Sequence, residues 1–138
     1  MLLTLTPPVF CNAAGELAAN PAGYAELHLA ASLIGATALA ELLTHTGALL
    51  LRRGWRGMLC NAQAIEGFDE ETMTWLLDYW LTQRVPQPPR LFKAQVMPTS
   101  PAAQASFGRL RELSPVHARY AYFAAEPAAH AYLTALVS

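Results

Sequence analysis

Residues 57–71 read GMLCNAQAIEGFDEE, and the rest of the chain is interpreted outward from them. The apolar run Met58–Asn61 is too short for a helix and follows Gly54 and Gly57, so it predicts a short buried strand. Asp69 marks the start of a helix, because its side chain can accept a hydrogen bond from a free backbone N–H group. A strand, a loop and a capped helix in this order are typical of an α/β domain.

Strands and one helix are predicted before this stretch. Leu2–Thr6 and Tyr24–Ala31 alternate apolar and polar residues, which is the period of a half-buried strand, and Val9–Cys11 can continue the first of them after two prolines. Asn12–Gly23 is rich in turn residues and predicts a loop or a wide hairpin connection. From Thr37 to Arg53 the period becomes helical. The apolar stripe of this helix consists of Leu39, Leu42, Leu43, Thr46 and Leu50.

The chain after Asp69 predicts three helices and two strands. The first of these helices has a core stripe that consists of Met73, Leu76, Leu77, Trp80 and Leu81. Prolines end it before a strand at Leu91–Met97, and Ser100 then caps a helix over Ala102–Leu113. A last strand at Ala118–Ala124 leads into a short closing helix after Glu126.

These elements predict a single α/β domain over residues 1–138. The order is β-β-α-β-α-β-α-β-α, with about five strands in a mixed sheet and about four helices. Crossover helices of this length place the later strands parallel and adjacent to one another. A chain of 138 residues is large enough for one core.

The composition excludes some classes of function. A net charge of -1 and a pI near 6.4 do not provide the basic surface that nucleic-acid binding needs. Charged residues make up only 14% of the chain, which favours a protein partner or self-association, as in a homodimer. The apolar segment Leu27–Leu51 could resemble a membrane span, but Glu41 lies inside it, so we expect a strand, a bend and a buried helix.

No catalytic constellation, metal site or cofactor site is predicted. Cys11 and Cys60 indicate no disulfide framework; the first residues lack the positive region of a signal peptide, and we expect a cytoplasmic protein with both thiols reduced. Cys60 lies in an apolar strand and is interpreted as a buried, inert thiol. Asp69 and its acidic neighbours are explained by helix capping. The histidines are scattered without the spacing of a metal site on one helix; they are His28, His45, His117 and His130.

The chain resembles the STAS-like family, the α/β domains of anti-sigma-factor antagonists (SpoIIAA-like proteins) and sulfate-transporter tails. The resemblance lies in Leu59–Asn61 before a loop and helix, in Leu91–Val96 before Pro98 and Ser100, and in Arg119–Phe123 followed by residues 126–136. It implies a non-catalytic regulatory or protein-interaction module. Family members are phosphorylated on a Ser or Thr after the central strand, and residues 61–71 contain neither, so no phosphoswitch is implied here.

Two functional hypotheses follow. Trp75 and Tyr79 lie four residues apart, off the core stripe of their helix, and aromatic pairs in such positions are enriched at protein interfaces. They indicate an interaction surface, with self-association as the leading hypothesis. The alternative is a small-molecule-binding protein or enzyme with a pocket at the strand ends. Its candidate residues are Asn61, Gln63, Met97 and Ser100.

Overall fold

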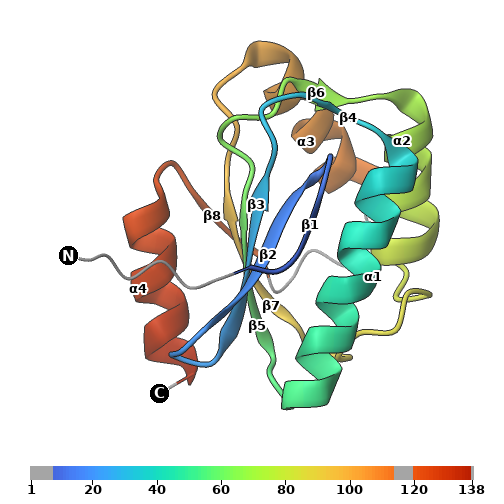
Figure 1. Ribbon diagram of the computed structural model, residues 1–138. Helices are drawn as coiled ribbons and strands as arrows, with labels where there is room; N and C mark the ends of the chain where they lie inside the picture. The colour runs from blue at the N-terminus through green and yellow to red at the C-terminus, as the bar shows by residue number, and fades with distance from the viewer. Residues whose placement is uncertain (1–7, 114–119, 138) are drawn as a thin grey trace.

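A computed structural model describes residues 8–113 and 120–137 and shows a central sheet with helices on both faces (Figure 1). The six strands of this sheet, in spatial order, are β1 (Pro8–Asn12), β2 (Gly15–Asn20), β3 (Tyr24–Leu29), β5 (Gly57–Asn61), β7 (Phe92–Val96) and β8 (Tyr120–Phe123). The helices are α1 (Ala36–Arg53), α2 (Glu70–Trp75), α3 (Pro101–Leu113) and α4 (Glu126–Val137). A π-helical turn, η1 (Leu76–Trp80), continues α2, and β4 (Leu33–Ile34) pairs with β6 (Gly67–Phe68) in a separate two-stranded sheet.

The predicted α/β class and mixed sheet are confirmed. β1, β2 and β3 form an antiparallel meander, whereas β3, β5, β7 and β8 are parallel neighbours. Each parallel connection contains a helix, as expected for crossovers. The sheet therefore has an antiparallel half built from hairpins and a parallel half built from crossovers.

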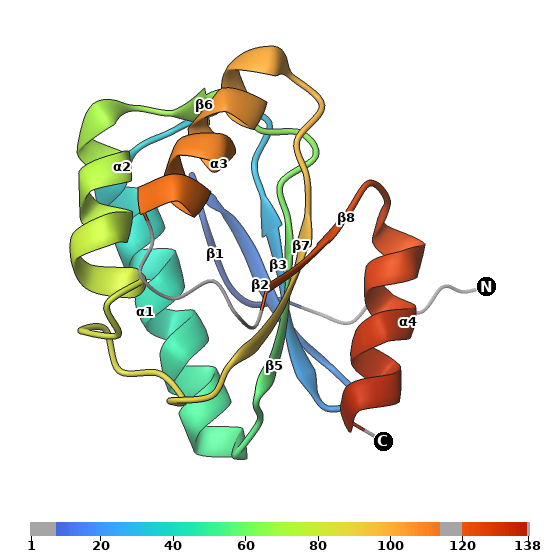
Figure 2. The same ribbon diagram turned by 180° about the vertical axis from the view of Figure 1, so that it is seen from behind.

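The helices are divided unequally between the two faces of the sheet. α1, α2 with η1, and α3 cover one face, which we call the helix-rich face (Figures 1 and 2). Among the described elements, α4 is the only helix on the other face, which we call the α4 face. The pleat of β3 sends Leu27 into the large core of the helix-rich face and Tyr24 into the small core under α4. The small core consists of Tyr24, Leu59, Ala94, Val96, Ala129 and Leu133.

Several local predictions are confirmed in detail. All five residues of the predicted α1 stripe are buried, and Gly54 ends the helix in the left-handed conformation with φ 67°. The Asp69 carboxylate accepts a hydrogen bond from the Thr72 backbone N–H at 2.8 Å. The Ser100 hydroxyl accepts one from the Ala103 N–H at 3.1 Å, and α3 begins at Pro101. Capping residues thus fix where both helices start.

The prediction of a loop over Asn12–Gly23 is wrong, because this stretch contains β2. Its turn residues form two separate tight turns, one before Gly15 and one between Asn20 and Tyr24, and the strand between them buries Leu17 completely. Gly15 has φ 152°, and a side chain there would lie 2.1 Å from the His28 carbonyl oxygen. The predicted strand at Leu2–Thr6 lies outside the described residues.

The helix after Asp69 also differs from its prediction. It is α-helical for only six residues and then widens into η1, which ends at Trp80 rather than near the prolines. The backbone hydrogen bonds of a π-helical turn join residues five positions apart in the sequence, a spacing that an apolar stripe does not reveal.

In residues 8–113 and 120–137, no helix has both the length and the apolarity that a bilayer crossing requires. Leu27–Leu51 forms the end of β3, a bend with the short β4, and most of α1, as predicted. Glu41 and His45 are exposed on α1. The apolar residues of this segment are therefore explained by their place in the protein core.

Candidate functional site

A cavity of about 80 Å³ lies between the sheet and the helices of the helix-rich face. Most of its wall is apolar and comes from β3, α1, β5, η1 and α3. Representative apolar residues of the wall are Leu27, Leu39, Met58, Leu76, Trp80 and Phe107. The polar residues of the wall are Cys60, Lys93, Gln95, Arg111, Tyr120 and Tyr122. An apolar cavity with a few convergent polar groups is the usual form of a small-molecule site.

Lys93 is the only lysine of the chain, and its side chain is buried in this wall. Its ammonium group donates a hydrogen bond to the Tyr120 hydroxyl at 2.5 Å. The Nζ atom lies 5.0 Å from the centre of the Trp80 ring and 4.6 Å from that of Tyr120. Burial lowers the pKa of Lys93 to about 7, only partly opposed by Cys60. No described Asp or Glu lines the cavity, so the ammonium group has no carboxylate partner there.

Cys60 and Gln95 occupy the same wall but offer little to a ligand. The Gln95 side-chain amide donates to the Cys60 carbonyl at 3.0 Å and to the Val96 carbonyl at 3.1 Å, so both of its N–H groups are used. Burial raises the pKa of the Cys60 thiol to about 11, against weaker opposing effects of Gln95 and Lys93. Cys60 is therefore a neutral thiol at physiological pH, which agrees with its interpretation as inert.

Two tyrosines and an arginine complete the polar side of the cavity. Burial, with smaller contributions from Tyr122 and Cys60, raises the pKa of Tyr120 well above its usual value, so Tyr120 keeps its proton. The guanidinium carbon of Arg111 lies 4.1 Å from the centre of the Tyr122 ring. Because Arg111 is exposed and also lines the cavity, it lies where the cavity meets solvent. The groups that this wall offers to a ligand are thus hydrogen-bond donors. Two of them, the Lys93 ammonium and the Arg111 guanidinium, are cationic.

The predicted strand-end residues are placed elsewhere. The side-chain amide of Gln63 donates to the Ala124 carbonyl at 3.1 Å, and the hydroxyl of Ser100 caps α3. Asn61 points to the α4 face, and Met97 is half-buried against the large core. None of these four residues lines the 80 Å³ cavity. A pocket formed by them stays a prediction.

The predicted interaction surface is partly core and partly exposed. The Trp75 and Tyr79 rings stack with centres 6.0 Å apart, and Arg84 lies 5.7 Å from the Tyr79 ring centre. Trp75 packs against the large core, while Tyr79 is 44% exposed. A shallow depression beside the pair is bordered by Glu70, Glu71 and Asp78. This face combines an aromatic centre with an acidic rim.

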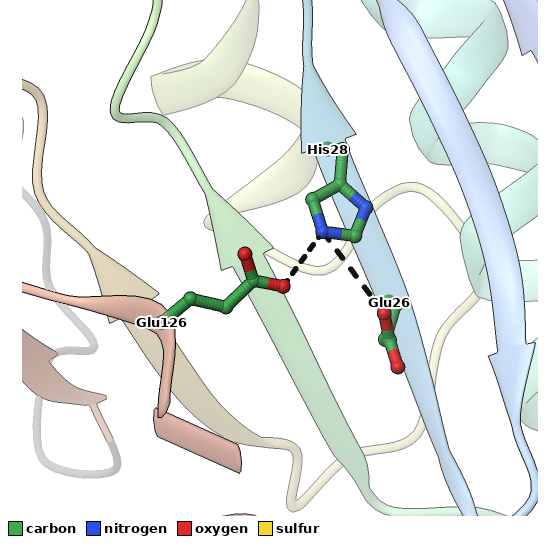
Figure 3. Close-up of side chains that lie close together, drawn as sticks. All are labelled: Glu26, His28 and Glu126. Atoms are coloured by element: carbon green, nitrogen blue, oxygen red, sulfur yellow. Dashed lines mark hydrogen bonds and ion pairs between the residues drawn. The ribbon is translucent and has the colours of Figure 1, made fainter. Parts of the chain in front are cut away.

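The α4 face holds a cluster of polar side chains that sequence reasoning missed (Figure 3). The Oε1 atom of Glu126 lies 2.9 Å from His28 Nε2 and 3.0 Å from His130 Nε2. Its Oε2 atom accepts a hydrogen bond from the Asn61 side-chain amide at 2.9 Å. Glu26 Oε2 lies 4.0 Å from His28 Nε2. The cluster therefore joins β3 and β5 to the first turn of α4.

The hydrogen bonds of this cluster control the charge of Glu126. Burial alone would raise the pKa of Glu126, but the bonds from His28, His130 and Asn61 together outweigh it and lower the pKa. Glu126 is consequently ionised at neutral pH. Three groups of the cluster could hold a metal ion, because the ligand atoms of Glu26, His28 and Glu126 all lie within 4.8 Å of one another.

Two sequence signals could have suggested the cluster. Glu26 and His28 share one face of a strand, and Glu126 and His130 are separated by one helical turn. Their meeting required the tertiary fold, since His28 and Glu126 are 98 residues apart.

No protein-family model, curated protein or solved structure matches this chain. The resemblance to STAS-like domains stays a prediction, and function is inferred from the geometry of the cavity and of the cluster.

Proposed function

We propose that this protein binds a small apolar carboxylic acid in the cavity of the helix-rich face, with the carboxylate held by Lys93 and Tyr120. The observation that carries the proposal is the burial of the only lysine of the chain in a largely apolar wall, to which the described residues contribute no carboxylate. Burying an ammonium group without a counter-ion is unfavourable, and an anionic ligand would supply the missing charge.

The donors around Lys93 favour a ligand rich in acceptor atoms. Lys93 donates to Tyr120, which leaves the Tyr120 hydroxyl proton free to donate to a ligand oxygen. Arg111 adds a guanidinium group at the solvent side of the cavity. A carboxylate has two oxygens and accepts from several donors, so it matches this set better than an alcohol or an amine does.

The size of the cavity limits the apolar part of the ligand. A volume of about 80 Å³ is roughly half that of the 150 Å³ engineered cavity that holds benzene. We therefore expect a short acyl chain rather than a long fatty acid. The leucine and aromatic side chains of the wall would contact this chain, and the proposal requires no catalytic step.

Isothermal titration calorimetry with propionate, butyrate and octanoate tests the proposal, with butanol and butyramide as neutral analogues. We expect butyrate to bind at least tenfold more tightly than butanol, octanoate to bind less tightly than butyrate, and Lys93→Met to remove the preference for the acid. Arg109→Met is the matched control, because Arg109 is an α3 cation paired with Glu70 outside the cavity. Equal affinity for the acid and the alcohol, or unchanged binding by Lys93→Met, would contradict the proposal.

The Trp75–Tyr79 face supports a second candidate function, that of a STAS-like module which self-associates. The specific observation is the exposed Tyr79 ring, stacked on a Trp that is anchored in the core. Light scattering of the wild type and of Trp75→Ala with Tyr79→Ala tests this candidate. A dimer that becomes a monomer in the double variant supports it, and a monomer in both samples excludes it.

A further inference from the structure

The first observation is the pairing of carboxylates and imidazoles on the α4 face. Glu26 and His28 project from the same side of β3, and Glu126 reaches them from the start of α4 (Figure 3). His130 follows one turn later and presents its Nε2 atom to the same Glu126 oxygen, at 3.0 Å. Two carboxylates and two imidazoles from two elements therefore converge.

The charge of this group is unbalanced. Within residues 8–113 and 120–137, no lysine or arginine forms an ion pair with Glu26 or Glu126. The Glu26 and Glu126 side chains are only 14% and 30% exposed, so water screens them incompletely. Two half-buried carboxylates beside imidazole nitrogens favour a divalent cation between them.

The surrounding contacts leave one oxygen of each carboxylate directed at the imidazoles. Asn20 donates to Oε1 of Glu26, so that Oε2 faces His28. Asn61 donates to Oε2 of Glu126, so that Oε1 faces the histidines. Metal-binding carboxylates and imidazoles are usually oriented by such outer hydrogen bonds.

Tyr24 provides a similar contact to His130. Its hydroxyl lies 2.5 Å from His130 Nδ1. Tyr24 therefore helps to fix the His130 ring, whose Nε2 atom contacts Glu126 Oε1, so the two residues orient a metal-binding carboxylate from outside the ligand group.

The distances suit a small transition-metal ion. Zinc bonds of about 2.0–2.1 Å in tetrahedral geometry place neighbouring ligand atoms roughly 3.3 Å apart. The His28 Nε2 atom lies 2.9 Å from Glu126 Oε1 and 4.0 Å from Glu26 Oε2, which brackets this value. Imidazole ligands favour Zn²⁺ over Mg²⁺ and Ca²⁺, which prefer oxygen.

We propose that Glu26, His28 and Glu126 form a Zn²⁺ site, with the fourth position open to water, while His130 contacts Glu126 from outside this group of ligand atoms. Zn²⁺ replaces the direct contact between His28 and Glu126 and ties α4 to β3. The site lies on the opposite face of the sheet from the carboxylic-acid cavity and does not depend on it.

Metal analysis after equilibrium dialysis of untagged, EDTA-treated full-length protein tests the site, with Zn²⁺ and Mg²⁺ as separate probes. We expect one Zn²⁺ per chain, and at least tenfold weaker binding in His28→Gln and in Glu126→Gln. Cys11→Ser and His45→Gln are matched controls, because Cys11 carries an exposed thiol and His45 is stacked on Phe10 away from the cluster. Both controls should bind Zn²⁺ within twofold of the wild type.

A measurement on the wild type alone avoids dependence on variants that fail to fold. Added Zn²⁺ should shift the NMR signals of the His28 and His130 rings and leave those of His45 unchanged. Absence of stoichiometric Zn²⁺ binding, or binding that neither variant weakens, would overturn the proposal. Equal binding of Zn²⁺ and Mg²⁺ would also overturn it, because it would indicate non-specific attraction to the carboxylates.

Discussion

The two faces of the sheet carry charged groups of opposite sign. On the helix-rich face, Lys93 lies in an apolar wall that contains no described carboxylate. On the α4 face, Glu26 and Glu126 are paired only with histidines among the described residues. Adjacent residues of the same strand contribute to both sites, since Cys60 lines the cavity and Asn61 contacts Glu126. The pleat of a strand thus separates charges that lie close together in the sequence.

This separation explains why each face is suited to a ligand of a different sign. The sheet and its packed side chains stand between Lys93 and the carboxylates, so neither can neutralise the other by direct contact. Each charge is instead stabilised by hydrogen bonds, from Lys93 to Tyr120 and from Asn61 and the histidines to Glu126. An anion on one face and a cation on the other would complete both sites.

The largest effect on the free energy of unfolding is expected from two core variants, one on each face of the sheet. Leu42→Ala on α1 and Leu133→Ala on α4 remove fully buried side chains, and each should lower the free energy of unfolding by about 2–5 kcal/mol. Urea denaturation measures this loss. Hydrogen exchange should show lost protection mainly in α4 for Leu133→Ala, because α4 packs alone on its face, and throughout the domain for Leu42→Ala. Identical exchange patterns would show that the faces unfold as one unit.

Lys93→Met should stabilise the empty protein, by an amount on the order of the 1–4 kcal/mol seen when buried ion pairs are replaced by apolar residues. The pKa of Lys93 is lowered to about 7 in the folded state, whereas in the unfolded chain it is about 10.4. Between these values the unfolded state binds more protons, so wild-type stability should rise as the pH increases from 7 to 10. Urea denaturation across this range measures the slope, which Lys93→Met should lack.

If the free energy of unfolding of the wild type does not change between pH 7 and pH 10, the burial of a titrating lysine is contradicted. The double variant Lys93→Met with Tyr120→Phe is the control for the Tyr120 hydroxyl, which loses its partner in the single variant. It should be at least as stable as the single variant.

Glu126→Gln should destabilise the metal-free protein by about 1.5–3 kcal/mol, the range for hydrogen bonds to a charged group. Because the pKa of Glu126 is lowered in the folded state, its contribution is complete above the unfolded pKa of about 4.3 and is lost as the pH falls through the folded value. Thermal melts of the wild type and of Glu126→Gln at pH 7 and pH 3, in EDTA, measure the difference in stability between them. The difference in stability between the wild type and the variant should be largest at pH 7 and smaller at pH 3. A constant difference would show that the charge of Glu126 is unimportant.

The smallest effect is expected at the start of α2, outside both charged sites. Asp69→Ala removes the cap to the Thr72 N–H, so stability at neutral pH should fall by about 1 kcal/mol. Chemical denaturation measures this change, and Asp69→Asn should restore most of it because Asn also caps. Asp69→Ala should leave ligand binding on both faces unchanged, and a loss on either face would link the cap to that site.

Periodicity and capping predicted most of the fold. The α1 stripe, the strand at Met58–Asn61 and the cap at Asp69 depend on neighbouring residues, and local rules describe them well. β2 was missed because Asn12–Gly23 contains enough turn residues to hide a short strand of small side chains. The widening of α2 into η1 depends on packing and leaves no pattern in the sequence.

The charged sites could not be predicted in this way. Lys93 and Gln95 alternate with the apolar residues of their strand, and polar residues in such positions are usually assigned to a solvated face. The helices that bury Lys93 come from distant parts of the chain. The histidine cluster depends on the contact between His28 and Glu126, which only the packing of α4 on the sheet creates.

The single lysine also makes the fold unusually simple to observe by amine chemistry. Reagents that acylate amines have one side-chain target in the whole chain, and that target is covered in the native state. The rate at which Lys93 is acylated therefore reports how often the helix-rich face opens to solvent. A ligand in the cavity should slow that reaction, which makes occupancy measurable by mass spectrometry without any added label.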